Sequence, residues 1–338
     1  MTKAKLVQRS NNGRYYLGDV TSVIQSRNLR NIRNRVQLIL TSPPFPLNNK
    51  KSYGNLQGEE YLAWFTKLAP LFADLLTDDG SIIIEMGNNW ESNRPVQSLL
   101  PLQSLLSFVG HENAGLRLIQ EFICYNPSRL PSPAQWVTVN RYRTVDSYTH
   151  VWWMAKSDFP KADNSKVLRP YSKSMKDLLA KGSYNAGQRP SEHIVSEKGF
   201  LKDLGGSIAQ NFFEIEALDP NREVRLPNAF SFSNTASNDF FLKACKEKNI
   251  TPHPARMPRG LAAFFIRYLS DKGDLVLDPF AGSNTTGYTA SRLGRKWIAI
   301  DVLEKYVEQS IIRFSDSSPI EEDDKYEHQQ TNNSNGLV

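Results

Sequence analysis

Residues 275–301 read LVLDPFAGSNTTGYTASRLGRKWIAID. The apolar run 275–278 predicts a strand that ends at Asp278, a turn over 281–283 and a helix over 285–293. A second strand over 297–301 ends at Asp301. Such a unit presents loop amides and a helix N-terminus to a ligand, and an acid at the second strand end accepts hydrogen bonds from ribose hydroxyls. An ordinary strand–turn–helix unit is the alternative. We predict a nucleotide-like cofactor site.

Further candidate strands and helices alternate at both ends of the chain. Strands are predicted over 14–19, 36–42, 82–84, 122–125 and 151–155, and helices over 60–76, 260–269 and 304–314. The residues 77–80 (TDDG) are expected to end the helix before them. Apolar strands that alternate with helices favour a doubly wound, mostly parallel α/β sheet covered on both faces.

The middle of the chain, 158–250, differs because it is polar and weakly periodic. We expect an inserted, loop-rich module there, between a first half over 1–157 and a cofactor-binding half over 251–315. The tail 316–338 is acidic and then rich in Gln and Asn, which is typical of disorder.

The body of the chain is basic. The net charge is +6, but residues 1–315 carry 40 basic against 29 acidic side chains, a surplus of 11. This suits a polyanionic partner such as nucleic acid, with a generic basic enzyme as the alternative. No run approaches the roughly 18 apolar residues of a membrane span, and no export signal is evident, so a cytoplasmic location without membrane contact is expected. Two cysteines and five scattered histidines indicate no metal site.

The residues of the loop after Asp278 narrow the choice of cofactor. The dinucleotide pattern GxGxxG and the phosphate loop ending in Gly-Lys-Ser/Thr are both absent, since the loop reads GSNTTG. A carboxylate and an aromatic ring in Asp278-Pro279-Phe280 suit an amino acid joined to an adenosine. S-adenosylmethionine fits, with Asp278 near its ammonium group and Asp301 near its ribose.

A second loop, TSPPF at 41–45, ends the predicted strand 36–42. Two prolines remove backbone donors, so the loop offers carbonyl oxygens and the Ser42 hydroxyl as acceptors beside the Phe45 ring. An exocyclic amino group on a stacked nucleobase would meet these groups well. A plain Pro-Pro turn is the alternative.

The two loops together resemble the amino-methyltransferases of DNA. SPPF (42–45) is similar to their catalytic tetrapeptide and FAGSN (280–284) to their cofactor loop, in the order of the circularly permuted beta group. YLGD (16–19) and HPARMP (253–258) are similar to two further cofactor motifs. The segments 49–55, 125–133 and 151–156 resemble the cytosine-N4 subgroup of restriction–modification systems. Asn284 departs from the usual second glycine, a change that this subgroup tolerates.

This resemblance implies a permuted S-adenosylmethionine-dependent methyltransferase fold and a site-specific duplex DNA methyltransferase. The implied catalytic residues are Ser42, Pro43, Pro44 and Phe45, with Glu85 as a further candidate that either orients Ser42 or the base or accepts bonds from loop amides. The implied cofactor-binding residues are Asp19, Thr41, His253, Pro254, Arg256, Asp278, Phe280, Ala281, Gly282, Ser283, Asn284, Thr285, Thr286 and Asp301. Region 158–250 is expected to recognise the target, with Lys161, Lys166, Arg169, Lys173, Lys176 and Arg189 on DNA.

Serine at the head of the tetrapeptide favours cytosine N4, and adenine N6 stays open as the alternative. Carbon-5 methylation needs a cysteine nucleophile, usually after proline, and Cys124 and Cys245 follow Ile123 and Ala244. A catalytically silent DNA-binding protein and an oxidoreductase are further alternatives, which the intact loops and the missing glycine pattern disfavour. RNA is a less favoured substrate than duplex DNA. We expect a monomer on DNA and allow for a companion restriction endonuclease.

Overall fold

A computed structural model describes residues 4–46, 56–215, 230–232, 240–253 and 256–315. Its elements are β1 (Lys5–Arg9), β2 (Gly13–Leu17), α1 (Val20–Ile24), η1 (Arg27–Ile32), β3 (Val36–Thr41), α2 (Gly58–Thr66), α3 (Leu68–Leu75), β4 (Leu76–Gly87), α4 (Leu100–Val109), β5 (Arg117–Tyr125), η2 (Gln135–Val139), β6 (Tyr148–Ala155), η3 (Asn164–Val167), α5 (Lys173–Lys181), β7 (Gly187–Gln188), β8 (Ile194–Val195), β9 (Phe212–Ile215), β10 (Phe230–Phe232), α6 (Phe240–Glu247), α7 (Arg259–Leu269), β11 (Leu275–Asp278), α8 (Thr285–Arg292), β12 (Lys296–Asp301) and α9 (Lys305–Phe314).

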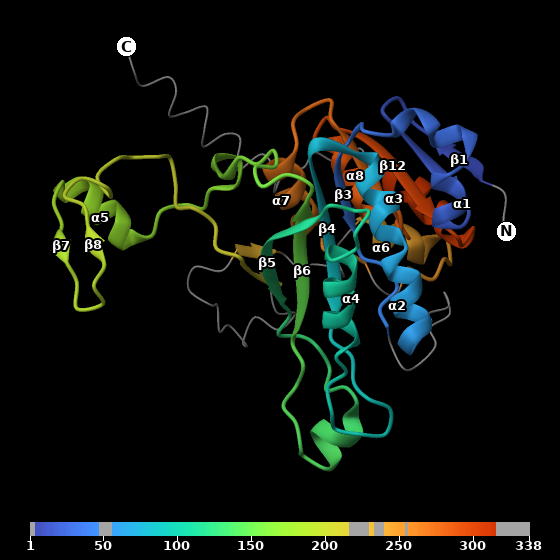
Figure 1. Ribbon diagram of the computed structural model, residues 1–338, viewed down its shortest axis with the longest axis horizontal. Helices are drawn as coiled ribbons and strands as arrows, with labels where there is room; N and C mark the ends of the chain where they lie inside the picture. Colours follow the sequence, from blue (N-terminus) through green and yellow to red (C-terminus); the bar gives the residue numbers. More distant parts are fainter. Residues whose placement is uncertain (1–3, 47–55, 216–229, 233–239, 254–255, 316–338) are drawn as a thin grey trace. The chain divides into compact units, whose positions relative to one another are not determined.

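A ten-stranded sheet in the order β1-β2-β12-β11-β3-β4-β6-β5-β9-β10 forms the centre of the fold (Figure 1). The five strands from β2 to β4 in this order are mutually parallel. β6 runs antiparallel to both β4 and β5, so β5 points the same way as β4. The predicted doubly wound, mostly parallel α/β sheet is therefore confirmed.

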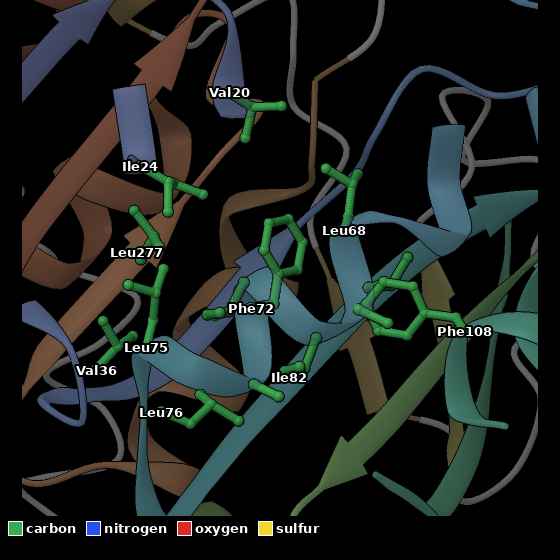
Figure 2. Close-up of a cluster of buried hydrophobic side chains, with 14 of the residues drawn as sticks. Val20, Ile24, Val36, Leu68, Phe72, Leu75, Leu76, Ile82, Phe108 and Leu277 are labelled. Carbon is green, nitrogen blue, oxygen red and sulfur yellow. The ribbon is translucent and has the colours of Figure 1, made fainter. Parts of the chain in front are cut away.

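Side chains alternate between the two faces of the central strands, as the pleat requires. Ile82, Leu277 and Trp152 belong to a buried cluster with helices α1 and α3, whereas the neighbouring Trp153 packs against Tyr268 of α7 on the other face. Figure 2 shows the first cluster, with Phe72 of α3 among residues from β3, β4 and β11. Both faces of the sheet are thus covered by helices.

The prediction of one continuous helix over 60–76 is wrong, because the structure has two helices there. α2 ends at Thr66 and α3 begins at Leu68, because Pro70 has no N–H for the Thr66 carbonyl and is tolerated only in the first turn of a new helix. The residues 77–80 do not separate helix from strand but lie inside β4, where the pairing with β3 shifts between Val36 and Leu38.

The chain forms two compact units. The described residues of the larger unit lie within 4–162 and 210–315, and those of the smaller unit are 163–209. The smaller unit contains η3, α5 and the short β7–β8 hairpin, and Tyr184 packs against Phe200 within it. The expected insertion 158–250 differs from this division, because β9 joins the main sheet beside β5. In the described part of the chain, no helix is both long and apolar enough to cross a membrane.

Candidate active site

A cavity of about 440 Å³ opens at the carboxyl ends of four adjacent parallel strands. Its walls are residues 18–20 after β2, Asp301 and Val302 at the end of β12, most of the loop 278–286 after β11, and residues 42–45 after β3. Open α/β sheets bind ligands at this edge because loops from neighbouring strands converge there. The two loops that the sequence singled out therefore face one cavity.

The loop after β11 is held in place by side chains from distant parts of the chain. Gly282 adopts φ +49°, and a Cβ on it would lie 3.0 Å from His253 Nε2, so glycine is required there. The Tyr15 hydroxyl donates to the Gly282 carbonyl at 2.7 Å. Arg313 of α9 donates to the Ser283 carbonyl at 3.0 Å and to its Oγ at 3.1 Å. The loop backbone is thereby fixed before a ligand enters.

Asn284 replaces the second glycine of the related motif for a reason that the structure makes clear. It adopts φ +61°, a region that Asn tolerates better than most residues. Its Oδ1 accepts the Gly287 N–H at 3.1 Å and caps α8, and its Nδ2 donates to Ser310 Oγ at 3.0 Å. Asn284 lies outside the cavity lining and supports the loop from behind.

Two carboxylates stand at the strand ends, the buried Asp278 and the partly buried Asp301. Asp278 Oδ1 accepts the Thr41 hydroxyl at 2.7 Å and the Phe280 N–H at 3.1 Å. Burial raises the pKa of Asp278 to about 6, although these hydrogen bonds favour its charged form. Asp301 accepts the Gly282 N–H at 2.8 Å and the Leu303 N–H at 2.9 Å, and burial raises its pKa as well. The cavity therefore carries two acids able to meet cationic or hydroxyl groups.

The loop after β3 is braced by the end of β4. Asn89 Nδ2 donates to the Pro46 carbonyl. A Cβ on Gly87 would lie 2.6 Å from the Phe45 ring, so this ring packs directly on the β4 backbone. Ser42, Pro43, Pro44 and Phe45 all line the cavity. The predicted catalytic tetrapeptide thus faces the same space as Asp278 and Asp301.

Glu85 lies behind this loop rather than in the cavity lining. Its carboxylate accepts the Thr149 hydroxyl at 3.1 Å and interacts with the Ser42 hydroxyl. Burial raises its pKa, while Thr149, the Arg129 charge and Ser42 lower it. A serine that donates its proton to Glu85 keeps its oxygen lone pairs available as acceptors. The geometry therefore favours Glu85 as a residue that orients Ser42.

The remaining cofactor candidates gather around the same cavity. Asp19 lines it and also caps α1 by accepting the Ser22 N–H at 3.0 Å. His253 lies against Tyr306, with ring centroids 4.2 Å apart, and Arg256 follows on the same wall. Thr41 does not line the cavity but holds Asp278. The lining also includes the predicted Phe280, Ala281, Gly282, Ser283, Thr285 and Thr286. Pro254 lies outside the described residues.

Several lining residues were not predicted from the sequence, among them Tyr61, Trp64, Val302 and Tyr306, whereas the lining residue Met257 belongs to the predicted cofactor motif 253–258. Trp64 packs against Phe280 with ring centroids 5.6 Å apart. Its helical spacing in the sequence shows that it points inward, but does not separate a cavity wall from the core. Tyr306 gave no signal beyond an amphipathic helix.

The predicted DNA-contacting residues fall in different places. Lys166, Arg169, Lys173, Lys176 and Arg189 belong to the smaller unit. Lys161 belongs to the larger unit, where it bridges Asp274 at 3.0 Å and Asp271 at 3.2 Å just before β11. Partial burial lowers the pKa of Lys161, but the two carboxylates outweigh it and the pKa is raised. This position, at the sheet edge opposite the cavity, argues against the phosphate contact expected of Lys161.

The cavity suits S-adenosylmethionine on its own chemistry. The Thr286 Oγ1 atom is buried in the cavity wall and has no well-aligned hydrogen-bond partner among the described residues. It lies close enough to Asp278 to favour the charged form of that carboxyl group. Asp278 can take an ammonium group, Asp19 and Asp301 can take hydroxyl or amino groups, and the apolar and aromatic walls can take an adenine ring. The residues present thus fit the ammonium group, the ribose and the adenine ring of this cofactor.

The fold and the two facing loops define a methyltransferase of the α/β class. The family model for DNA methylases of the N6/N4 type matches residues 36–312, and the chain belongs to this family. It is therefore a DNA methyltransferase that acts on an amino group.

The chain is 39% identical over 315 residues to the type II methyltransferase M.PvuII of Proteus hauseri, covering 93% of this chain and 87% of the relative. It is 24% identical to the type II methyltransferase M.EcaI of Enterobacter cloacae, over 79% and 62% of the two chains. The solved structure of the PvuII DNA methyltransferase, described as cytosine-N4-specific, matches with a TM-score of 0.68 at 32% identity and covers 97% of this chain and 94% of its own.

Proposed function

We propose that this DNA methyltransferase transfers the methyl group of S-adenosylmethionine to the N4 amino group of cytosine in duplex DNA, as the modification enzyme of a restriction–modification system. The observation that carries the proposal is the pairing of Ser42-Pro43-Pro44-Phe45 with the Asp278–Asp301 loop system across one cavity. The similarity to a cytosine-N4-specific relative over nearly the whole chain supports it.

In the proposed mechanism, the target base leaves the stack, at a cost of a few kcal/mol, and its ring lies on Phe45. The N–H groups of its amine donate to the Pro43 carbonyl and to Ser42 Oγ. The Ser42 hydroxyl donates its hydrogen bond to Glu85, so the lone pairs of Ser42 Oγ stay available to accept from the base. These bonds favour a pyramidal nitrogen with an available lone pair. Positioning of two reactants in this way contributes on the order of 7–11 kcal/mol.

S-adenosylmethionine supplies an electrophilic methyl group when bound. Asp278 would hold its ammonium group, with Asp19 and Asp301 on the adenosine. Ser42 is too weak a base to deprotonate the amine in advance, so the proton passes to water after transfer, when the nitrogen is cationic. No covalent bond to the protein is needed.

Target recognition is proposed for region 158–250, within which the smaller unit presents Lys173 and Lys176 on α5. Both side chains are exposed, and basic side chains on DNA contact phosphates most often. Alanine at both positions should weaken duplex binding and leave cofactor binding unchanged. Unaltered duplex affinity would remove the main support for this assignment.

We propose further that a monomer methylates one strand per visit and that a companion endonuclease shares its target sequence.

The experiment that tests the function is labelled methyl transfer to plasmid DNA followed by nucleoside analysis. N4-methylcytosine is expected, and N6-methyladenine would establish the alternative base. Single-molecule sequencing of DNA from an expressing host would report the base and its surrounding motif together.

The Ser42→Ala variant should lose most methyl transfer while it still binds S-adenosylmethionine. Full activity in that variant would refute the role given to Ser42.

A further inference from the structure

Two long connections leave the sheet at the edge where the cavity opens. Residues 88–99 follow the carboxyl end of β4, and residues 126–147 follow that of β5, which points the same way as β4. We call these two segments together the arm. They lie side by side, since Asn88 Nδ2 donates to Asp146 Oδ1 at 2.8 Å and the Arg143 guanidinium lies 3.2 Å from the centre of the Trp90 ring. Figure 1 shows them extending together beyond the strands, with η2 in the second segment.

The root of the arm is anchored by a polar network. His150 contacts Glu121 at 2.6 Å and Asn88 at 3.0 Å through its two ring nitrogens. Arg129 pairs with Asp146 at 3.0 Å and also donates to the Tyr148 carbonyl at 3.0 Å. These bonds tie both segments to β6, and through His150 to β5, so the arm is attached to the sheet at a defined place.

The same root supports the catalytic loop. Asn89 belongs to the arm and donates to the Pro46 carbonyl, and Phe45 packs on Gly87, the residue before the arm. A base held at Ser42 therefore lies next to the point where the arm leaves the sheet. Any duplex that delivers this base passes close to the arm.

The outer surface of the arm is apolar and basic. Three large apolar or aromatic residues of the arm are highly exposed: Leu130 to 83%, Tyr142 to 72% and Val139 to 66%. Its four arginines face only two acids, Glu91 and Asp146, and Asp146 is already paired with Arg129. Arg94 and Arg141 are exposed and form no ion pair within the described residues. Exposed apolar and aromatic groups beside unpaired arginines match base faces and phosphates.

We propose that the arm is a DNA-contacting element that binds the duplex beside the target base. Arg94 and Arg141 contact phosphates, and the Tyr142 ring stacks on a base left exposed when the target swings out. The inference rests on the proposed function, because only an enzyme that extracts a base leaves such a face. It assigns to the larger unit a DNA contact separate from region 158–250.

The charge part is tested with an Arg94→Ala/Arg141→Ala double variant. Its matched control is Lys272→Ala/Lys296→Ala, which removes two exposed basic groups at the amino ends of β11 and β12, the edge away from the cavity. Duplex affinity is measured over a range of salt concentrations. The arginine variant should bind more weakly, with a salt slope smaller in magnitude by about 1.8, which corresponds to two phosphates at about 0.9 each. An arginine variant indistinguishable from the lysine variant would overturn this part.

The stacking part is tested with Tyr142→Ala against Tyr142→Phe. Both are assayed for methyl transfer and for the fluorescence of 2-aminopurine at the target position, which rises when the base leaves the stack. In Tyr142→Ala, loss of one base–aromatic stack should lower the methyl-transfer rate and the rise in 2-aminopurine fluorescence by ~5-fold to 150-fold. Tyr142→Phe should keep the wild-type values of both. Cofactor binding should stay unchanged in both, which excludes misfolding. Equal signals from Tyr142→Ala and wild type would overturn the stacking. If wild type itself methylates no base, the proposed function fails, whereas the salt-slope test of the arm stands by itself.

Discussion

Asp278 is the carboxylate that we propose to hold the ammonium group of the cofactor, so its protonation state should control cofactor binding. Burial raises its pKa to about 6, so below that pH a growing share of empty protein carries the neutral form. A neutral carboxyl group holds an ammonium group less well than a carboxylate. The dissociation constant for S-adenosylmethionine should therefore rise as pH falls through about 6, by up to ~10-fold per unit. Titration calorimetry between pH 5 and 8 measures this directly.

Thr41 provides the control for this pH dependence. Its hydroxyl donates to Asp278 Oδ1 at 2.7 Å and favours the charged form. Thr41→Val should move the loss of affinity to higher pH, because the neutral form is then relatively more stable. Asp278→Asn should bind weakly at every pH and show no inflection. A flat wild-type profile through pH 6 would contradict the assignment of the ammonium site to Asp278.

Glu85 is expected to act on the rate and not on cofactor binding. Its carboxylate accepts a hydrogen bond from the Ser42 hydroxyl outside the cavity lining, and replacing this carboxylate by an amide weakens a charge-assisted hydrogen bond. Such bonds contribute about 1.5–3 kcal/mol, so Glu85→Gln should lower kcat by ~10-fold to 150-fold. Thr149→Val removes the other hydroxyl that Glu85 accepts and should have a smaller effect. An unchanged kcat in Glu85→Gln would leave Ser42 oriented by other means.

At this scale the sequence predicted the site well where chemistry and a strand end coincide. Ser42 and Asp278 are polar residues at the ends of apolar runs, and both face the cavity. Thr41 and Asn284 were placed in the right loops, but as ligands instead of supports. Tyr61 and Trp64 were not recognised because an inward-facing aromatic looks the same in sequence whether it lines a cavity or fills a core.

Among the elements, the helix α8 and the loop before it depend on one unusual residue. Asn284 combines φ +61° with two side-chain hydrogen bonds, to the Gly287 N–H and to Ser310 Oγ. Asn284→Ala should destabilise the protein by about 1–3 kcal/mol, since alanine loses both bonds and also resists the left-handed conformation. Urea unfolding measures the difference.

Asn284→Gly separates these two causes. Glycine also loses both side-chain bonds but adopts φ +61° freely. Its destabilisation should be smaller than that of Asn284→Ala by about 1 kcal/mol. Equal losses in the two variants would mean that backbone conformation contributes nothing and that the hydrogen bonds account for the whole effect.

The elements were predictable in proportion to how regular their patterns are. β11 matches its predicted bounds, and β12 extends its predicted range by one residue, because buried parallel strands are short apolar runs with clear polar ends. The break between α2 and α3 was missed since both halves keep the same apolar face across Pro70. β9 was missed because it is one short strand in a polar region, paired to a partner far away in sequence.

For the whole molecule, the two ends of the chain were assigned to one sheet correctly because strands and helices alternate in both. The boundary of the smaller unit was harder to predict. Residues 210–215 leave the polar region and join β5, and this pairing depends on tertiary contacts such as that of Phe213 with Phe122, with ring centroids 5.4 Å apart. Local composition carries no information about such a contact.

Charge is the property of the whole molecule that bears most directly on DNA affinity. Residues 316–338 carry six acids and one lysine, so the chain shortened to 1–315 has a net charge of +11 in place of +6. The shortened chain should bind non-specific duplex more tightly at low salt, because a basic surface releases more counterions without a competing anionic segment. The gain should vanish as salt shortens the Debye length below about 8 Å.

A full-length variant with Glu321→Gln, Glu322→Gln, Asp323→Asn and Asp324→Asn keeps the length of the tail and removes four of its charges. It should reproduce most of the tighter binding, and kcat at saturating DNA should not change in either form, since Ser42 and Asp278 are untouched. Binding is measured by fluorescence anisotropy on a duplex without the target sequence. If only the shortened chain binds more tightly, the tail acts through its bulk, and the electrostatic explanation is wrong.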